Sequence, residues 1–264
     1  MDRLLKTKGY KIIRNVIPHN LLNDMILLIA KRFTEITKQE LKSKPIINFN
    51  VSKELEDNLL NLRENKPEIF SYLYDSVQSS VSLNQLITYK KLINNLCKTT
   101  GIKKEFFSTS GHIQRIDNPY DKKNLYSWHQ ETSYYGQSPS GDNCFFVWIP
   151  LFNAEKKNGS VIIAEGSHME GYIKTDLKKK NDKFSSQQRI IDEKVVKKYK
   201  LSQPKINKGD VCIMHFNTLH KSGLNSTNKF RFTAIGRFHF TSTPGFKPFR
   251  YKIQLNNIKP NKGL

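Results

Sequence analysis

The strongest constraint on the fold is a series of short β-type segments in the second half of the chain, each bounded by turn residues. They cover Phe106 to Ile116, Cys144 to Leu151, Ser160 to Ala164, Asp210 to Phe216, and Phe230 to Phe240. The last segment, FRFTAIGRFHF, alternates for much of its length as a half-buried antiparallel strand does. Several short strands separated by turns are typical of an all-β sandwich or barrel.

The first hundred residues have a helical pattern instead. Apolar residues from 21 to 33 follow a helical spacing, and Asn20 is a candidate N-cap just before them. Further helical patterns cover 52–64 and 67–97, with Gly101 as a plausible stop. Helices followed by many strands indicate a mainly β core with flanking helices.

We expect residues 1–264 to form a single domain, because all-β folds of this size are routinely one unit. Within it, residues 1–105 supply mostly helical support and residues 106–240 form the β core. A lysine-rich insertion at 169–206 interrupts the strands, and 241–264 is a basic tail. Long loops of this kind are usually functional lids or disordered segments, so the insertion is expected to cover the pocket mouth.

The formal net charge of +21 permits an anionic partner, such as nucleic acid, lipid or an acidic small molecule. The excess comes mainly from lysine, which codon bias in a low-GC genome also produces. Aromatic residues are not interleaved with the charges as single-strand stacking requires, so nucleic acid is an unlikely partner. A basic protein that modifies nucleic acid or polysaccharide stays open as an alternative.

The sequence predicts a cytoplasmic protein that acts on a small molecule. It has no apolar run of about 18 residues, the length that a membrane helix needs. Its amino terminus is charged and lacks the apolar segment of a secretory signal. Three cysteines, Cys97, Cys144 and Cys212, are far apart and without CxxC spacing, which favours reduced thiols. The oligomeric state is left open.

The stretch SWHQETSYY holds the residues most suited to chemistry. On a strand, residues two apart share a face, so His129 and Glu131 can reach one ion while Gln130 points away. Two imidazoles and one carboxylate with open positions are the ligand set of non-haem iron(II) oxygenases. The aromatic residues around the pair are expected to line the site or the core.

A second histidine is needed, and His215, His220 and His239 lie downstream. His215 lies inside an apolar strand, where packing is the expected role. His220 lies just past that strand's end, where a barrel presents side chains to its mouth. His220 is therefore the better candidate, and His112 and His239 are expected to have structural roles.

The order of these motifs resembles the phytanoyl-CoA dioxygenase-like family of iron(II)/2-oxoglutarate oxygenases, which includes ectoine hydroxylase. After His-x-Glu come NGSVIIAEGSH, then Gly209-Asp210, and then His220, Ser222, Asn225 and Arg231. The ten-residue gap from Asp210 to His220 and the eleven-residue gap from His220 to Arg231 are both those of the family. The resemblance covers about residues 106–240.

The resemblance implies a double-stranded β-helix, a jelly roll with N-terminal helices, and a set of site residues. It implies that His129, Glu131 and His220 bind iron(II). Arg231 would hold the distal carboxylate of 2-oxoglutarate, which suits its planar, permanently charged guanidinium. Ser222 and Gln114 match residues that contact the same cosubstrate.

The implied reaction uses Fe(II), 2-oxoglutarate and O2 and releases succinate and CO2. The expected outcome is hydroxylation of an unactivated C–H bond in a small metabolite, possibly anionic or carrier-linked. A retained metal-binding carboxylate argues against halogenation, because halide needs that coordination position. A non-catalytic relative that only binds a ligand in the pocket is the alternative.

The chain departs from the family pattern at two positions. Glu131 stands where most relatives have aspartate, and its extra methylene extends the carboxylate by about 1.5 Å, one C–C bond. A working ligand is expected, with a weakened metal site as the alternative. Glu165 stands where proline is usual, in a loop expected to shape the entrance and so to bear on substrate choice.

Overall fold

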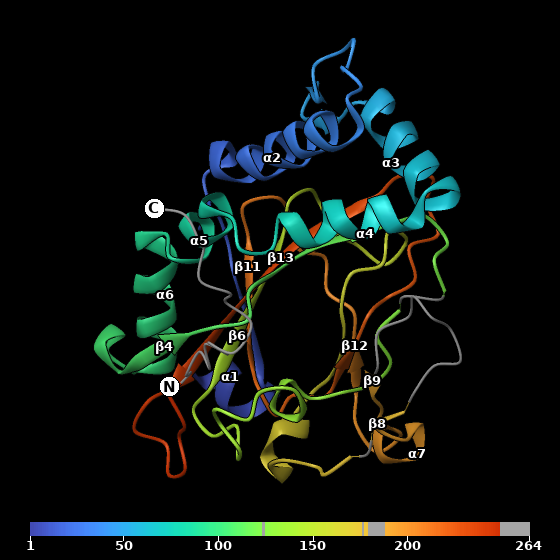
Figure 1. The fold of residues 1–264 in the computed structure, drawn as a ribbon. Coiled ribbons are helices and arrows are strands. Elements are labelled where there is room, and N and C mark those ends of the chain that lie inside the picture. The colour runs from blue at the N-terminus through green and yellow to red at the C-terminus, as the bar shows by residue number, and fades with distance from the viewer. Residues whose placement is uncertain (123–124, 176, 179–187, 249–264) are drawn as a thin grey trace, which may run out of the picture.

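The β core is built on one large antiparallel sheet (Figure 1). The structure, a computed structural model, describes residues 1–122, 125–175, 177–178 and 188–248. The sheet contains β1 (Tyr10–Ile13), β11 (Val211–His215), β6 (Phe145–Pro150), β13 (Arg231–Phe240), β4 (Phe107–Thr109) and β5 (Ile113–Asp117). Strand β13 is the organising strand, because it pairs with β6 on one side and with β4 and β5 on the other.

A smaller antiparallel sheet provides the opposing wall of the core. It consists of β10 (Leu201–Ser202), β7 (Ile162–Ala164) and β12 (His220–Lys221). Two such sheets with helices at the amino-terminal end form the predicted double-stranded β-helix. The fold class expected from the sequence is confirmed.

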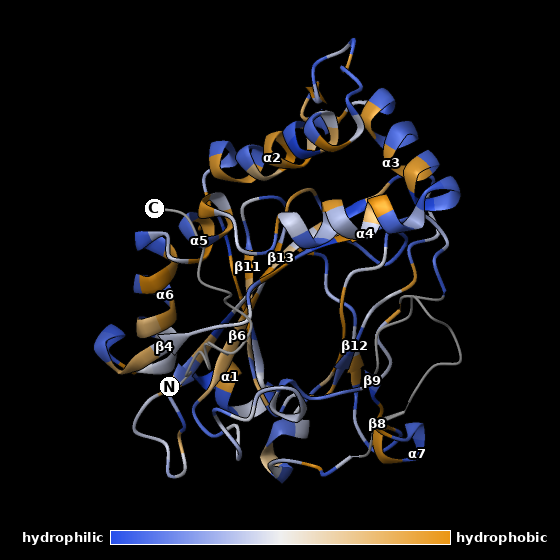
Figure 2. Ribbon diagram, in the orientation of Figure 1, coloured by the Kyte–Doolittle hydropathy of each residue, from blue (hydrophilic) through white to orange (hydrophobic). Residues whose placement is uncertain are grey.

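Five helices cover the outer face of the large sheet (Figure 1). They are α2 (His19–Thr37), α3 (Lys53–Asn65), α4 (Pro67–Ser76), α5 (Val81–Ile87) and α6 (Lys90–Thr100). In Figure 2 the helices are striped apolar and polar, as expected for helices that bury one side. Their buried leucines and phenylalanines join the sheet residues Val147 and Phe232 in one hydrophobic cluster.

The helical region differs from the sequence prediction in its boundaries. The predicted helix over 67–97 is three helices, since Ser80 begins a new one by accepting a hydrogen bond from the Leu83 N–H. Asn20 is not the N-cap of α2: Pro18 has that position, and Asn20 lies inside the helix. Gly101 ends α6 with φ of 75°, as predicted.

The amino terminus is the part that sequence reasoning misassigned. Instead of a continuous helical region it forms α1 (Arg3–Lys8) followed by β1, which pairs with β11 at the edge of the large sheet. Gly9 makes the link at φ of 79°, and a Cβ there would come within 2.5 Å of Thr218 Oγ1. Four strand residues are too few for periodicity to distinguish a strand from a helix.

One of the expected β segments is interrupted. The predicted strand over 106–116 consists of a short 3-10 helix, η1 (Lys104–Phe106), then β4 and β5, and Gly111 at φ of 63° lies between the two strands. Both strands still pair with β13. Two small hairpins lie outside the core sheets: β2 (Ile46–Ile47) with β3 (Asn50–Val51), and β8 (Leu177–Lys178) with β9 (Gln188–Arg189).

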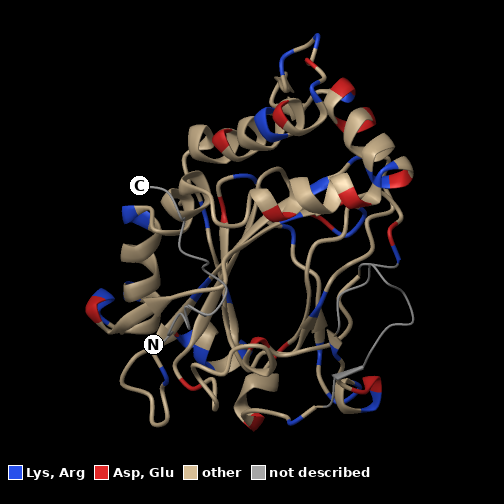
Figure 3. Cartoon of the chain, in the orientation of Figure 1, with Lys and Arg blue, Asp and Glu red and all other residues tan. Residues whose placement is uncertain are grey.

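The described parts of the 169–206 insertion have secondary structure. They include β8, β9, α7 (Glu193–Val196) and β10, and the Ile191 N–H donates to the Trp128 carbonyl beside His129. Lys179 and Lys180, where a lid was expected, lie outside the described residues, as does the tail from residue 249. Figure 3 shows acidic and basic residues interspersed on α2, α3 and α4. None of the helices in the described ranges is long and apolar enough to cross a membrane.

Candidate metal centre

Backbone pairing places His129 and His220 opposite each other. The His129 N–H donates to the His220 carbonyl and the His220 N–H donates to the His129 carbonyl, each at 3.1 Å. This reciprocal pair is the hydrogen-bonded site of an antiparallel ladder, which sets facing residues side by side. The two ring centroids are 4.2 Å apart, and both side chains are buried.

Glu131 completes the cluster from a short 3-10 helix, η2 (Glu131–Ser133). Its N–H donates to the Phe216 carbonyl, and its Oε1 lies 3.6 Å from His220 Nε2. Candidate ligand atoms of the two histidines and Glu131 all lie within 4.8 Å of one another. Three atoms around one ion with bonds of about 2 Å lie up to about 4 Å apart, so the cluster is close to a binding geometry. As predicted, Gln130 points away and bonds the Gly171 and Asn217 carbonyls.

Neighbouring carbonyl groups fix the tautomer of both histidines. His129 Nδ1 lies 2.7 Å from the Ser127 carbonyl oxygen, and His220 Nδ1 lies 2.9 Å from the Thr218 carbonyl oxygen. A carbonyl only accepts, so each Nδ1 carries the proton and each Nε2 has a free lone pair. Burial and the nearby His220 lower the pKa of His129 to about 3, so its imidazole is neutral near pH 7. A neutral imidazole with a free Nε2 atom suits iron(II).

Arg237 pairs with the Glu131 carboxylate inside the protein. Its Nε donates to Oε2 at 2.7 Å, and its Nη2 donates to Oε1 at 3.4 Å. Burial alone would raise the pKa of Glu131, but the adjacent Arg237 guanidinium holds that pKa below its ordinary value. The carboxylate is therefore ionised, as a metal ligand must be.

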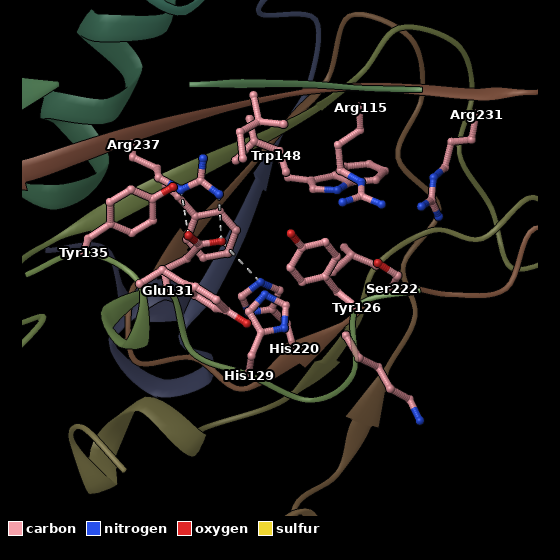
Figure 4. Close-up of a pocket in the computed structure, with 16 residues that line it drawn as sticks. Arg115, Tyr126, His129, Glu131, Tyr135, Trp148, His220, Ser222, Arg231 and Arg237 are labelled. Carbon is pink, nitrogen blue, oxygen red and sulfur yellow. Dashed lines mark hydrogen bonds and ion pairs between the residues drawn. The ribbon is translucent and has the colours of Figure 1, made fainter. Parts of the chain in front are cut away.

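A cavity of about 170 Å³ opens beside these side chains (Figure 4). Aromatic residues form part of its wall: Tyr126, Tyr134, Tyr135, Phe146 and Trp148. Tyr134 Oη accepts a hydrogen bond from the Arg189 N–H, which ties the described part of the insertion to this wall. Tyr126, Tyr134, Tyr135 and Trp148 thus line the cavity and Trp128 lies in a buried hydrophobic cluster, both in agreement with the expectation that these aromatics line the site or the core.

A second charged group lies elsewhere in the same cavity. Arg231 donates to Asp117 from Nη2 at 2.9 Å and from Nε at 3.3 Å, and Arg115 bonds the same carboxylate from β5. Ser222 also lines the cavity, near Arg231 in the view of Figure 4. Burial would raise the pKa of Asp117, but the two arginines hold it below its ordinary value. Two cations and one anion leave this group with a net charge of about +1.

Gly159, the glycine of the NGS motif, allows the close approach that positions Arg231. Its φ is 82°, and a Cβ there would lie 2.5 Å from the Gly223 carbonyl oxygen and 2.6 Å from Arg231 Nη1. Arg231 Nη1 also donates to that carbonyl at 3.3 Å. A larger residue would displace the guanidinium, which gives a physical reason for glycine here.

Gln114 and Glu165 do not lie where the sequence analysis expected them. Strand β5 alternates, so Ile113 and Arg115 face the cavity, whereas Gln114 faces the helices, its backbone bonded to the side chain of Gln78. The expected contact between Gln114 and the cosubstrate is therefore wrong. Glu165 is not among the residues that line the cavity, and it accepts hydrogen bonds from Tyr10 and Lys8.

The other histidines have the structural roles expected of them. His215 packs against Phe145, and its Nδ1 accepts the Asn217 N–H outside the cavity. His239 lies between the Ser110 and Ser138 hydroxyl groups. Neither lines the cavity, and neither does His112.

The motif order and spacing did not identify Arg115, Asp117 or Arg237 as residues of the site. Alternation along β13 would have found one of them, since Arg231, Ile235 and Arg237 all face the cavity. The link between Arg231 and Asp117 depends on the β5–β13 register, in which these two residues are directly paired. The register between these two strands cannot be inferred from a single sequence.

Two buried histidines and a carboxylate, grouped beside a cavity in an antiparallel jelly roll, define the class of non-haem iron oxygenases with a facial ligand triad. The chain belongs to the phytanoyl-CoA dioxygenase family, whose model, described as Phytanoyl-CoA dioxygenase (PhyH), matches residues 5–233. It is thus an iron(II)- and 2-oxoglutarate-dependent oxygenase, as its resemblance to the family predicted, and its cofactors are iron and 2-oxoglutarate.

Solved structures show the same fold at low sequence identity. EctD from S. alaskensis with bound Fe has a TM-score of 0.58 and 12% identity, over 91% of this chain and 75% of that one. The epimerase SnoN from nogalamycin biosynthesis has a TM-score of 0.57 and 12% identity, over 99% of this chain and 88% of that one. AviO1 from Streptomyces viridochromogenes Tue57 has a TM-score of 0.54 and 15% identity, over 92% of this chain and 94% of that one. No curated protein sequence gives a significant match.

Proposed function

We propose that this chain hydroxylates an unactivated C–H bond of a small metabolite, with release of succinate and CO2. In this proposal iron(II) is bound by His129, Glu131 and His220. The observation that carries it is the geometry of the buried cluster, with the ligand atoms within 4.8 Å of one another and both Nδ1 atoms engaged by carbonyls. Bound iron(II) and 2-oxoglutarate together supply the activation of dioxygen.

Arg231 and Ser222 are proposed to hold the distal carboxylate of 2-oxoglutarate. The net charge of about +1 on the group of Arg231, Arg115 and Asp117 matches one incoming carboxylate. Arg231 is 7% exposed, so its hydrogen bonds are shielded from water. Gln114 is not part of this proposal, because its side chain faces the helices.

The protein's own residues orient the reactants and exclude water. Aromatic side chains of the cavity, including Tyr126 and Trp148, cover part of its wall and shield that part from water. When iron is bound, Glu131 would take the position that a halide needs, which favours hydroxylation. Structural neighbours include an epimerase and a carbocyclase, so the fold alone does not set the reaction outcome.

The substrate is proposed to be small, and an anionic group would suit it. Ligand cavities commonly have about 300–1,000 Å³, and this one, which must also hold the cosubstrate, has about 170 Å³. Lys221 is a further cation on its lining. We also propose that the chain acts as one domain, because a single hydrophobic cluster extends from Leu5 to Phe238.

The test is a screen for succinate release. Protein loaded with iron(II), 2-oxoglutarate and ascorbate is incubated with a metabolite library, and succinate and hydroxylated product are measured together. His129→Ala should remove the activity, whereas His19→Ala, a matched change at an exposed histidine, should retain it. If the protein binds iron and 2-oxoglutarate tightly but releases no succinate, even from 2-oxoglutarate alone without a substrate, the result would favour a binding protein instead.

A further inference from the structure

The two oxygen atoms of Glu131 differ in how closely Arg237 engages them. Oε1 lies 3.6 Å from His220 Nε2, on the side of the metal-ligand candidates, and accepts only a long hydrogen bond of 3.4 Å from Arg237 Nη2. Oε2 accepts the 2.7 Å hydrogen bond from Arg237 Nε, on the side of β13. Figure 4 shows the carboxylate between the histidines and the Arg237 guanidinium. One oxygen is thus directed at the metal position while the other is already engaged.

Arg237 is held firmly enough to act as a fixed partner. Its Nη1 donates to the Gly111 carbonyl at the break between β4 and β5. Its guanidinium lies over the Tyr135 ring, 4.7 Å from the centroid. Its backbone is paired with Phe146 in the centre of the large sheet, and its side chain is 6% exposed. An arginine restrained on three sides cannot follow the carboxylate if the carboxylate moves.

We propose that Arg237 is the positioning residue that makes Glu131 a single-oxygen metal ligand. The inference rests on the proposed function, because it takes Glu131 to be a ligand. By occupying Oε2, Arg237 prevents Glu131 from coordinating through both oxygens, so the positions needed by 2-oxoglutarate and dioxygen stay open. It also accounts for glutamate where relatives have aspartate, because the extra methylene carries the carboxylate about 1.5 Å further toward Arg237.

A pairing of this kind predicts that the effects of changing Arg237 and Glu131 depend on each other. In Glu131→Asp the shorter side chain withdraws the carboxylate from the fixed guanidinium. Arg237 then has little left to position, so its loss should matter less. Residues that act through one shared contact give non-additive changes, and residues with separate roles give additive ones.

The experiment is a double-mutant cycle on metal affinity, with Mn(II) as an oxygen-stable probe in calorimetric titration. Arg237→Gln should weaken Mn(II) binding by about 10- to 100-fold, the usual effect of losing a group that orients a ligand. In the Glu131→Asp background the same change should cost less than about threefold, the resolution assumed for additivity. Arg237→Lys should restore part of the loss, since lysine retains a charge and a donor.

The controls separate the possible failures. Arg32→Gln alters an exposed arginine on α2 and should leave Mn(II) affinity unchanged. If Glu131→Ala binds Mn(II) as tightly as the parent, Glu131 is no ligand and the proposed function itself is wrong. If Glu131→Ala loses the metal but Arg237→Gln keeps full Mn(II) affinity, only the positioning role is wrong. The same conclusion holds if Arg237→Gln lowers the Mn(II) affinity equally in the parent and in the Glu131→Asp background. Should Arg237→Gln fail to fold, Arg237→Lys in both backgrounds gives the same comparison.

Discussion

Replacing Arg231 with alanine should weaken 2-oxoglutarate binding strongly and leave metal binding intact. The proposed iron ligands and Arg231 are separate groups in one cavity. The hydrogen bonds of Arg231 go to Asp117 and to the Gly223 carbonyl, and not to the proposed iron ligands. The change removes one of the two cations that share Asp117. The group's net charge then falls from about +1 to about zero, and the distal carboxylate meets no excess positive charge.

The magnitude follows from the burial of the site. Removing one partner of a buried charge pair typically costs about 3–5 kcal/mol, and about 1.4 kcal/mol corresponds to a tenfold change in affinity. This corresponds to a loss of roughly 100- to 3,000-fold in 2-oxoglutarate affinity. We expect the lower end, about 100-fold, because Arg115 remains beside Asp117 and can supply part of the attraction.

The assay is calorimetric titration of 2-oxoglutarate into Mn(II)-loaded protein, with the Mn(II) affinity measured separately. Arg231→Lys should fall between the parent and alanine, because lysine keeps the charge but loses the fork geometry. Arg32→Ala, at an exposed arginine, should change neither affinity. Unchanged 2-oxoglutarate affinity in Arg231→Ala would show that Arg115 or Arg237 holds the cosubstrate and would refute the assignment.

The remaining predictions concern metal binding, packing and acid stability. His220→Ala should abolish iron(II) binding, whereas His215→Ala should retain it; iron retained by the first variant and lost by the second would reverse the assignment. Gly236→Ala should lower the free energy of unfolding by about 1–3 kcal/mol in urea titration, because its Cβ would collide with Ile87; an unchanged midpoint would show that α5 can move. Burial, with the charge of Arg237, lowers the pKa of His239 to about 4 in the folded protein. Below about pH 6.5 the unfolded chain therefore binds the proton while the folded chain does not. The free energy of unfolding contributed by the neutral ring is lost as the pH falls from about 6.5 toward 4. His239→Gln should therefore reduce the slope of unfolding free energy in that window by up to about 1.4 kcal/mol per pH unit, and an identical slope would assign the acid sensitivity to other groups.

The sequence predicted the residues that a linear motif can encode. His129 and Glu131 are two positions apart, and His220 lies just beyond an apolar strand, so motif spacing sufficed to identify them, although Glu131 lies on the 3-10 helix η2 and not on the expected strand. The glycine of NGS and the arginine eleven residues after His220 were likewise identified by order and spacing. The short strands and their turns predicted a mainly β core with flanking helices, and the resemblance to the family predicted the jelly roll.

The errors concern register and boundaries. Gln114 was placed in the site although its neighbours Ile113 and Arg115 face the cavity, because a shift of one residue on a strand reverses the face. The contacts of Asp117 and Arg237 depend on which strands lie beside β13. Such contacts join residues more than a hundred positions apart, and local patterns carry no information about them.

The most direct test of the account is an anaerobic crystal structure of the protein with iron(II) and 2-oxoglutarate, measured with anomalous scattering at the iron edge. The account predicts one iron peak about 2 Å from His129 Nε2, His220 Nε2 and a single oxygen of Glu131, with Arg237 still bonded to the other oxygen. Iron held by His215, or an iron site without Glu131, would contradict it.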